Sequence, residues 1–259
     1  MDSIVIDCKE LVKVFKSGKL EKLKNGVNDK IAVNKLSFQV KKGEIYGLLG
    51  PNGAGKTTTL RMLATLLSPD SGSIYINGNI TSPQEIRKRV GFLTNELHLE
   101  DCFSADYYYD YFGALYGLTK EEINQRKAVI FSKLGIHRFK NVRYGELSTG
   151  MKQKVSLAVS IVHDPEIIIF DEPTNGLDIV AAKNVIDFIK EMKNLGKTII
   201  LSTHIFSLVE NVCDRVGIII DGRMIEVCDV QDILAKTSIE EKFFEIYKEN
   251  NDEAVFNNF

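Results

Sequence analysis

The sequence lacks an uninterrupted apolar run of about 18 residues or more, the length that a membrane-spanning helix needs. It also lacks a basic start followed by an apolar stretch, so we expect no signal peptide at 1–7. The formal net charge is -2, and the missing basic excess argues against broad nucleic-acid binding. We therefore expect no nucleic-acid partner, and we expect any role at a membrane to depend on another protein.

Cysteine is scarce and scattered. The four cysteines (Cys8, Cys102, Cys213 and Cys228) form no CxxC pair and have no metal-ligand spacing. They fit reduced thiols at ordinary positions of a cytosolic protein. With 259 residues, 44% hydrophobic and 26% charged, the chain is long enough for one sizeable domain or a domain with an inserted subdomain.

One stretch fits the phosphate-loop pattern G-x-x-x-x-G-K-[ST], between an expected strand at 44–49 and an expected helix at 58–67. Its glycines allow several backbone N–H groups to face one phosphate chain, next to the positive end of the helix dipole. We expect the lysine to reach the β- and γ-phosphates and the first threonine to ligate Mg²⁺. The expected nucleotide-binding residues are Gly50, Pro51, Asn52, Gly53, Ala54, Gly55, Lys56, Thr57 and Thr58.

The rest of the chain alternates strands with helices, which predicts an α/β fold with a mainly parallel sheet covered on both faces. Before the phosphate loop, strands at 4–14 and 32–40 flank a Lys-rich loop and predict an antiparallel portion. Residues 95–163 are expected to be mainly helical, with Ser104 as a cap and a capping box at Thr119–Glu122. We expect the aromatic stripe at 107–116 to pack in the core, and the chain after Asn250 to be frayed.

A second motif delivers two acids at the end of the apolar strand 167–170. Asp171 is expected to hold Mg²⁺ through water, and Glu172 to polarise the water that attacks the γ-phosphate. Adjacent carboxylates also occur at plain strand ends. Their position downstream of a phosphate loop favours the functional interpretation.

Three further stretches follow the same order along the chain: LSTGM at 147–151, NGLD at 175–178 and LSTH at 201–204. Together with the phosphate loop and IIIFDEP, they resemble the ATP-binding cassette (ABC) family over nearly the whole chain. Within that family, the run at 48–72 is similar to the ATPase subunits of two-component exporters, including the sodium-extruding type. The resemblance implies one P-loop NTPase domain over 1–259, with a core of 1–94 and 164–236, a helical subdomain at 95–163 and a C-terminal helix and tail at 237–259.

The resemblance also implies roles at matching positions. Phe15 corresponds to an aromatic that stacks on adenine, and the alternative is a core residue at a strand end. Ser148, Gly150 and Asp178 would contact the nucleotide bound by a second subunit, and His204 would sense the γ-phosphate. The other histidines match nothing in the family.

Three positions depart from the family pattern. Thr149 and Met151 stand where the family usually has Gly and Gln, and similar exporters tolerate both changes. The metal-contacting Gln of the family should follow the strand 90–93. Asn95 aligns best with it, and Glu96 is the other candidate.

The resemblance implies an ATPase that uses ATP and Mg²⁺, closes as a homodimer or heterodimer and drives a separate transmembrane permease through residues 95–163. It would then lie on the cytoplasmic, inner face of the membrane. An alternative is a soluble ABC ATPase with a non-membrane partner, such as a cluster-assembly complex. A GTPase or small-molecule kinase is disfavoured because Asn34-Lys35 precedes the phosphate loop and lacks the base-reading Asp.

Overall fold

The computed structural model describes residues 3–16, 29–79, 82–94 and 99–256, with side chains described up to residue 250. The described chain forms two compact units. The first unit contains residues 1–82 and 200–259, and the second contains residues 83–199. The expected helical subdomain at 95–163 is a different kind of division from these two units, so its boundaries remain a prediction.

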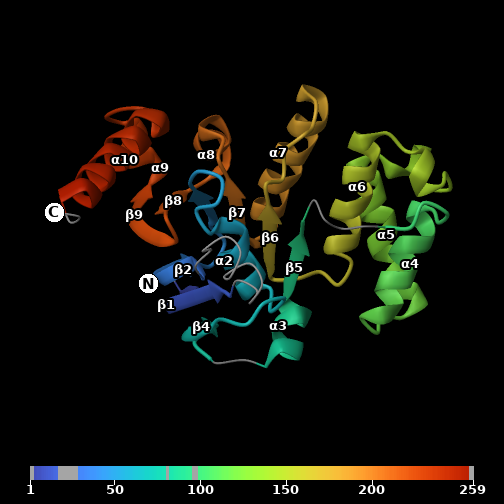
Figure 1. Cartoon of the computed structure of the whole chain (residues 1–259). Helices are drawn as coiled ribbons and strands as arrows, with labels where there is room; N and C mark the ends of the chain where they lie inside the picture. The colour runs from blue at the N-terminus through green and yellow to red at the C-terminus, as the bar shows by residue number, and fades with distance from the viewer. Residues whose placement is uncertain (1–2, 17–28, 80–81, 95–98, 257–259) are drawn as a thin grey trace, which may run out of the picture. The chain divides into compact units, whose positions relative to one another are not determined.

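The first unit holds two groups of strands. Its elements are β1 (Ile4–Phe15), β2 (Lys30–Lys41), β3 (Ile45–Leu49), α2 (Lys56–Leu63), β4 (Ser71–Ile76), most of β7 (Thr198–Thr203), α8 (Phe206–Val212), β8 (Arg215–Ile220), β9 (Arg223–Asp229), α9 (Val230–Leu234) and α10 (Ile239–Phe256). Strands β2, β1 and β4 form an antiparallel sheet in that order and lie side by side in Figure 1. Strands β7, β3, β8 and β9 are neighbours in the other group.

Strand β3 is the central element of the first unit. All five of its residues are buried, as expected for an apolar strand covered on both faces. It runs parallel to β8, and β8 pairs antiparallel with β9. Its entry is anchored by the Ile45 amide, which donates to Asp214 Oδ2 at 2.8 Å, and by the pair Arg215 Nη1–Glu44 Oε1 at 3.2 Å. Burial raises the pKa of Glu44.

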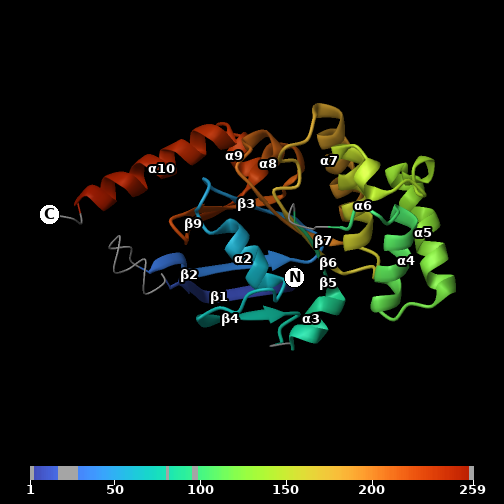
Figure 2. The ribbon, with the colours of Figure 1, turned by 45° about the vertical axis from the view of Figure 1, so that its right-hand side comes forward.

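The second unit contains α3 (Pro83–Arg89), β5 (Val90–Leu93), α4 (Ala105–Leu115), α5 (Lys120–Leu134), short 3₁₀ turns at Ile136–Arg138 and Tyr144–Glu146, α6 (Thr149–Ser160), β6 (Ile167–Asp171) and α7 (Ile179–Asn194). Strands β5 and β6 are parallel. Helices α4, α5 and α6 lie together in Figures 1 and 2. The predicted α/β fold with a mainly parallel sheet, an antiparallel N-terminal portion and a helical insertion is confirmed.

Local capping explains where these helices begin. Ser104 Oγ accepts from the Tyr107 amide at the start of α4. Thr119 and Glu122 form the expected capping box of α5, and Gly135 ends that helix with φ 66°. These side chains satisfy amides that have no partner within the helix.

Two predicted helix ends were wrong. Helix α2 ends at Leu63 rather than at Leu67, because Thr65 adopts a left-handed conformation with φ 57°. Helix α10 continues to Phe256 rather than fraying after Asn250, and Figure 2 shows it as one long helix. No Gly or Pro interrupts residues 239–256, and Glu and Ala favour the helix.

The aromatic stripe at 107–116 does not belong to the core as a whole. Tyr108 and Tyr109 are buried, whereas Tyr107, Tyr111 and Tyr116 are exposed. Helical spacing explains this division, since positions 108 and 109 share one face and 107 and 111 share the neighbouring one. The prediction of a core role is therefore right for only part of the stripe.

No helix in the described ranges is long and apolar enough to cross a membrane. The four cysteines form no disulfide among the described residues, and Cys8 and Cys213 are buried, Cys102 is exposed and Cys228 is half-buried. Burial raises the pKa of the Cys8 thiol, which keeps it protonated.

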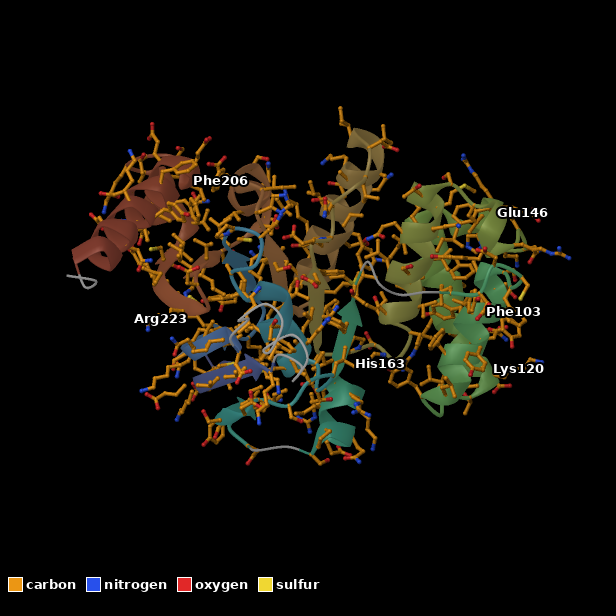
Figure 3. The ribbon with its side chains drawn as sticks, viewed as in Figure 1. Phe103, Lys120, Glu146, His163, Phe206 and Arg223 are labelled. Carbon is orange, nitrogen blue, oxygen red and sulfur yellow. The ribbon has the colours of Figure 1, made fainter. Side chains whose placement is uncertain are left out.

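His163, labelled in Figure 3, connects α4 to β5 within the second unit. Its ring stacks on Tyr116 with centroids 4.0 Å apart, and its Nε2 lies 3.2 Å from the Val90 carbonyl oxygen. Burial lowers the pKa of His163 to about 4, and the nearby Arg126 and Lys197 also lower it. The Val90 hydrogen bond and Asp164 oppose the shift. The folded protein therefore favours the neutral ring.

This shift predicts a loss of stability in mild acid. Because the folded pKa lies below the ordinary value of about 6.5, the stabilisation is complete above pH 6.5 and is lost as the pH falls towards 4. After a discount for partial exposure, we expect His163 to account for about 1 kcal/mol of the loss at pH 5. Urea unfolding of wild type and His163→Gln at pH 7.5 and pH 5 measures it. Equal pH dependence in both proteins would contradict the assignment.

Candidate functional site

The phosphate loop is enclosed by two other segments of the first unit. A Cβ on Gly55, where φ is 99°, would lie 2.3 Å from the Ala32 carbonyl oxygen of β2. A Cβ on Gly50 would lie 2.2 Å from the Ile219 carbonyl oxygen of β8. Gly53 has φ 86° but no heavy atom near its missing Cβ. The three glycines are thus needed for different reasons, namely close approach, backbone conformation or both.

The turn between β8 and β9 holds the loop in place. Asp221 and Gly222 have φ of 47° and 77°, as a tight hairpin turn requires. The Gly222 amide donates to the Ala54 carbonyl at 3.1 Å, and the Gly222 carbonyl accepts from the Asn34 amide at 2.8 Å. This turn therefore ties the phosphate loop to β2, a connection that sequence reasoning did not predict.

Lys56 lies in the first turn of α2, within the loop. It is buried, and its Nζ donates to the Gly50 carbonyl at 2.8 Å and to the Pro51 carbonyl at 3.1 Å. The neighbouring Thr57 and Thr58 are half-buried, and the Thr59 hydroxyl donates to the Gly55 carbonyl at 2.9 Å. The loop is thus pre-organised around the ammonium group, with Asn52 and Gly53 exposed at its tip.

Phe15 ends β1 with 45% of its side chain exposed, so it is not a core residue. It pairs with Lys30 of β2, two positions from Ala32, the residue that Gly55 approaches. Two residues of a strand span about 7 Å. The register therefore places an exposed aromatic ring near the phosphate loop.

His204 follows the end of β7, before α8, and is exposed. Strand β7 is a neighbour of β3, the strand that leads into the phosphate loop. The Ile205 amide donates to Thr203 Oγ1 at 3.0 Å, which shapes the turn that carries His204.

In the second unit, β6 delivers the two acids. Strand β6 is buried throughout, and Asp171 at its end is buried as well. Leu93 of β5 is paired with Phe170 of β6, so the register brings Thr94 next to Asp171. Asn95 and Glu96, the two candidates for the metal-contacting position, lie outside the described residues.

Glu172 has a left-handed backbone with φ 51°, a conformation that is uncommon for a residue with a side chain. Its carbonyl accepts from the Asn175 amide at 3.1 Å, and the following Pro173 carbonyl accepts from Gln153 Nε2 at 3.3 Å. Gln153 on α6 thus fixes the turn after Glu172. Sequence reasoning missed this residue, although it stands five positions after Ser148.

The same unit brings Ser148, Gly150 and Asp178 together. Ser148 caps α6 by accepting from the Met151 amide at 3.3 Å, and Asp178 caps α7 by accepting from the Ala181 amide at 2.8 Å. A Cβ on Gly150 would lie 3.2 Å from Ala181 Cβ, so the two helix starts pack against each other. Each presents free amides and a positive dipole end.

Exposed apolar side chains lie directly beside these helix starts. Ile179 is 89% exposed and Val180 is 71% exposed at the start of α7. Thr149 is exposed too, so among the described residues there is room for a side chain at the position where the family usually has Gly. Large apolar groups beside a polar helix start are typical of a surface that another molecule covers.

Each unit by itself offers an oxygen group of the kind that Mg²⁺ takes as a ligand. In the first unit this is the Thr57 hydroxyl, next to the phosphate loop, and in the second it is the Asp171 carboxylate at the end of β6. Gly50 and Gly55 lie close to backbone oxygens of β8 and β2, which holds the phosphate loop in a compact conformation of the kind that binds phosphate. The phosphate loop and Thr57 are therefore of the chemical kind that suits a nucleotide phosphate chain and Mg²⁺, and so is Asp171 for Mg²⁺.

Comparison with known proteins identifies the family. The family model described as ABC transporter matches residues 33–175, more than half of the chain. The ABC transporter ATP-binding protein NatA of Bacillus subtilis is 44% identical over 197 residues, which cover 75% of this chain and 80% of NatA. The Nod factor export ATP-binding protein I of Burkholderia orbicola is 39% identical over 76% of this chain and 66% of its own length.

A solved structure agrees with these sequence matches. CbiO1 from Clostridium perfringens, part of the ABC transporter complex CbiONQ, has a TM-score of 0.77 and 26% identity over 91% of this chain and 92% of its own. With the family match and the phosphate loop, this likeness shows the same α/β cassette. The chain therefore belongs to the ABC transporter family, as an ATP-binding subunit that hydrolyses ATP.

Proposed function

We propose that the chain powers an exporter, by closing with a second ATPase subunit on ATP and driving a separate membrane-spanning permease. This proposal rests on the observation that one chain has both a phosphate loop and an exposed helix start at Ser148, beside the exposed Ile179. The name of the Nod factor export protein supports the direction of transport. CbiO1 supports action within a membrane complex, which would place the subunit at the cytoplasmic face.

On the phosphate side, the loop amides of 50–58 would hold the triphosphate and Lys56 would neutralise the β- and γ-phosphates. Phe15 would stack on the adenine. Thr57, Asp171 and Asn95 would hold Mg²⁺, with Glu96 as the alternative to Asn95. When bound, the metal neutralises charge on the phosphate oxygens.

Glu172 would accept a hydrogen bond from the attacking water and orient it towards the γ-phosphate. Its backbone is held by Asn175 and, through Pro173, by Gln153, so the carboxylate starts from a fixed position. His204 would sense the γ-phosphate from the end of β7.

The second half of the site would come from another subunit. The helix start at Ser148 and Gly150 would bind the γ-phosphate held by the partner's loop, and the Asp178 turn would lie across the interface. Burial of Ile179 and Val180 in that interface would stabilise the closed pair. ATP contacts both halves only in the closed state, so its hydrolysis would release them.

The permease would dock on the second unit at α4. Phe103, Tyr107 and Tyr111 form an exposed aromatic row, with centroids 4.3 Å apart for the first pair and 6.0 Å for the second. Aromatic side chains are enriched at protein interfaces. Phe103 is labelled in Figure 3, in the segment before α4.

Affinity purification from gently solubilised native membranes tests this proposal. We expect a polytopic membrane protein to co-purify in a fixed ratio, and we expect Tyr107→Ala/Tyr111→Ala to reduce its recovery by at least about tenfold, because hot-spot aromatics contribute about 2 kcal/mol or more. Phe244→Ala, at an exposed aromatic on α10, is the matched control.

The same preparation distinguishes the alternatives. Recovery only with a soluble partner would overturn the permease proposal and favour the cluster-assembly class. Identification of the ATPase subunits that co-purify distinguishes a homodimer, with this chain alone, from a heterodimer, with a related subunit as well. The identity of the permease indicates the cargo.

A further inference from the structure

The second unit has a cavity of about 350 Å³, and none of the predicted nucleotide-binding residues lines it. One face of α5, the chain around the end of α6, β6 and the end of α7 enclose it. Its apolar lining consists of Tyr109, Val129, Ile130, Ile161, Pro165, Ile168, Met192 and Leu195. Val129 and Leu195 are 53% and 58% exposed and therefore leave the apolar lining open to solvent.

Cationic groups surround this apolar cavity. Arg126, Lys133 and Lys197 line it, and Asp164 is the one carboxylate among its described lining residues. Lys197 Nζ donates to Asp164 Oδ1 at 2.6 Å, and Lys133 pairs with Glu191 on α7. Two of the three cations thus have a carboxylate partner.

Arg126 is the exception among the three. Its Nη1 donates to the Val162 carbonyl at 3.1 Å, and no carboxylate of the described residues lies within ion-pair distance of it. A guanidinium carries five donors in a planar fork that matches a carboxylate. It therefore has donors left for an anion in the cavity.

Tyr109 adds a second hydrogen-bond donor. Its side chain is buried, and its hydroxyl has no hydrogen-bond partner within the described part of the chain. Burial raises the pKa of Tyr109, so the hydroxyl keeps its proton, with Arg126 and Asp164 as the charged groups nearby. A buried hydroxyl without a partner costs about 1–3 kcal/mol, which a ligand oxygen would recover.

We propose that this cavity binds a small amphipathic carboxylate, with its apolar body against Ile130, Ile168 and Met192 and its carboxylate on Arg126 and Tyr109. A volume of 350 Å³ holds roughly a dozen heavy-atom groups of about 30 Å³ each, the size of a water molecule or a methylene. This number suits a carboxylate with a chain of about ten carbons. The positive surroundings select an anion over a cation of the same length. Binding does not depend on the proposed transport function.

The absence of tryptophan from the chain allows a direct test. Val129→Trp places a single indole on the exposed side of the cavity, and Ala128→Trp places one on the neighbouring exposed position that does not line it. We expect decanoate, below its micelle-forming concentration, to shift the emission of Val129→Trp to shorter wavelength in a saturable manner. We expect no saturable shift in Ala128→Trp.

Two further measurements test the head group. Arg126→Gln in the Val129→Trp background should weaken decanoate binding about tenfold, because a charge-assisted hydrogen bond is lost. Decyltrimethylammonium, with the same chain and opposite charge, should bind at least about tenfold more weakly than decanoate. Circular dichroism checks that the Arg126 variant folds.

Wild-type protein supplies the control for the introduced indole. Decanoate should raise its Tm by a few degrees, as expected for a ligand that binds only the folded state, and should do so less in Arg126→Gln. Equal responses of the two tryptophan variants would overturn the proposal. Equal binding of both detergents, or an unchanged affinity in Arg126→Gln, would overturn it as well.

Discussion

Replacement of Glu172 by Gln is expected to leave ATP binding intact while slowing hydrolysis about 100- to 10,000-fold. The substitution removes the charge that we propose orients the attacking water, and it preserves the size of the side chain. The contacts of Asn175 with the Glu172 carbonyl and of Gln153 with the Pro173 carbonyl involve backbone atoms, so the strained turn should persist. Phosphate release under saturating ATP and the Kd of a fluorescent ATP analogue measure the two effects.

Glu166→Gln is the matched control for this variant. Glu166 is an exposed carboxylate just before the same strand β6, and its replacement changes the net charge equally. We expect its turnover to equal that of wild type. Turnover like wild type in Glu172→Gln would contradict the assignment of Glu172 as the group that orients the water.

The slow variant also reports on subunit closure. ATP that is not hydrolysed should hold two copies together, so Glu172→Gln should elute as a dimer with ATP and as a monomer without it. Ile179→Asp in this background should abolish the dimer, because a buried charge would replace an apolar contact. A monomer with ATP in Glu172→Gln would argue against closure between identical subunits.

Gly55→Ala should weaken nucleotide binding strongly, with an expected destabilisation of the loop by about 3 kcal/mol or more. The added Cβ would lie 2.3 Å from the Ala32 carbonyl oxygen, at a backbone φ of 99° that side chains rarely adopt. The Ala32 carbonyl belongs to the backbone of β2 and Gly55 is buried, so relief of this contact requires the backbone to move. We expect an ATP affinity at least about 100-fold below that of wild type, measured with the same fluorescent analogue.

Gly53→Ala separates backbone strain from collision. Gly53 has a similar φ of 86°, and no heavy atom lies within 4 Å of its missing Cβ. The strain alone should cost about 1–2 kcal/mol and reduce the affinity about tenfold. Equal losses in the two variants would show that the contact with Ala32 is unimportant.

Helix starts and motif-bearing strands were predictable from sequence, because their causes are local. Ser104, Thr119, Ser148 and Asp178 each accept a hydrogen bond from an amide three residues later. The phosphate loop and the two acids after β6 are likewise short segments whose spacing specifies their chemistry. Errors arose where local signals compete, as in the left-handed Thr65 that ends α2 early.

By itself, the sequence determined the family, the order of strands and helices and the residue types that meet a nucleotide, because each depends on neighbours along the chain. Only the tertiary structure decided which glycines are irreplaceable, since Gly50 and Gly55 meet Ile219 and Ala32 from distant segments. It also decided which tyrosines of α4 are buried, and it brought Arg126 and Tyr109 to one cavity. Contacts between distant residues depend on packing, which no local pattern encodes.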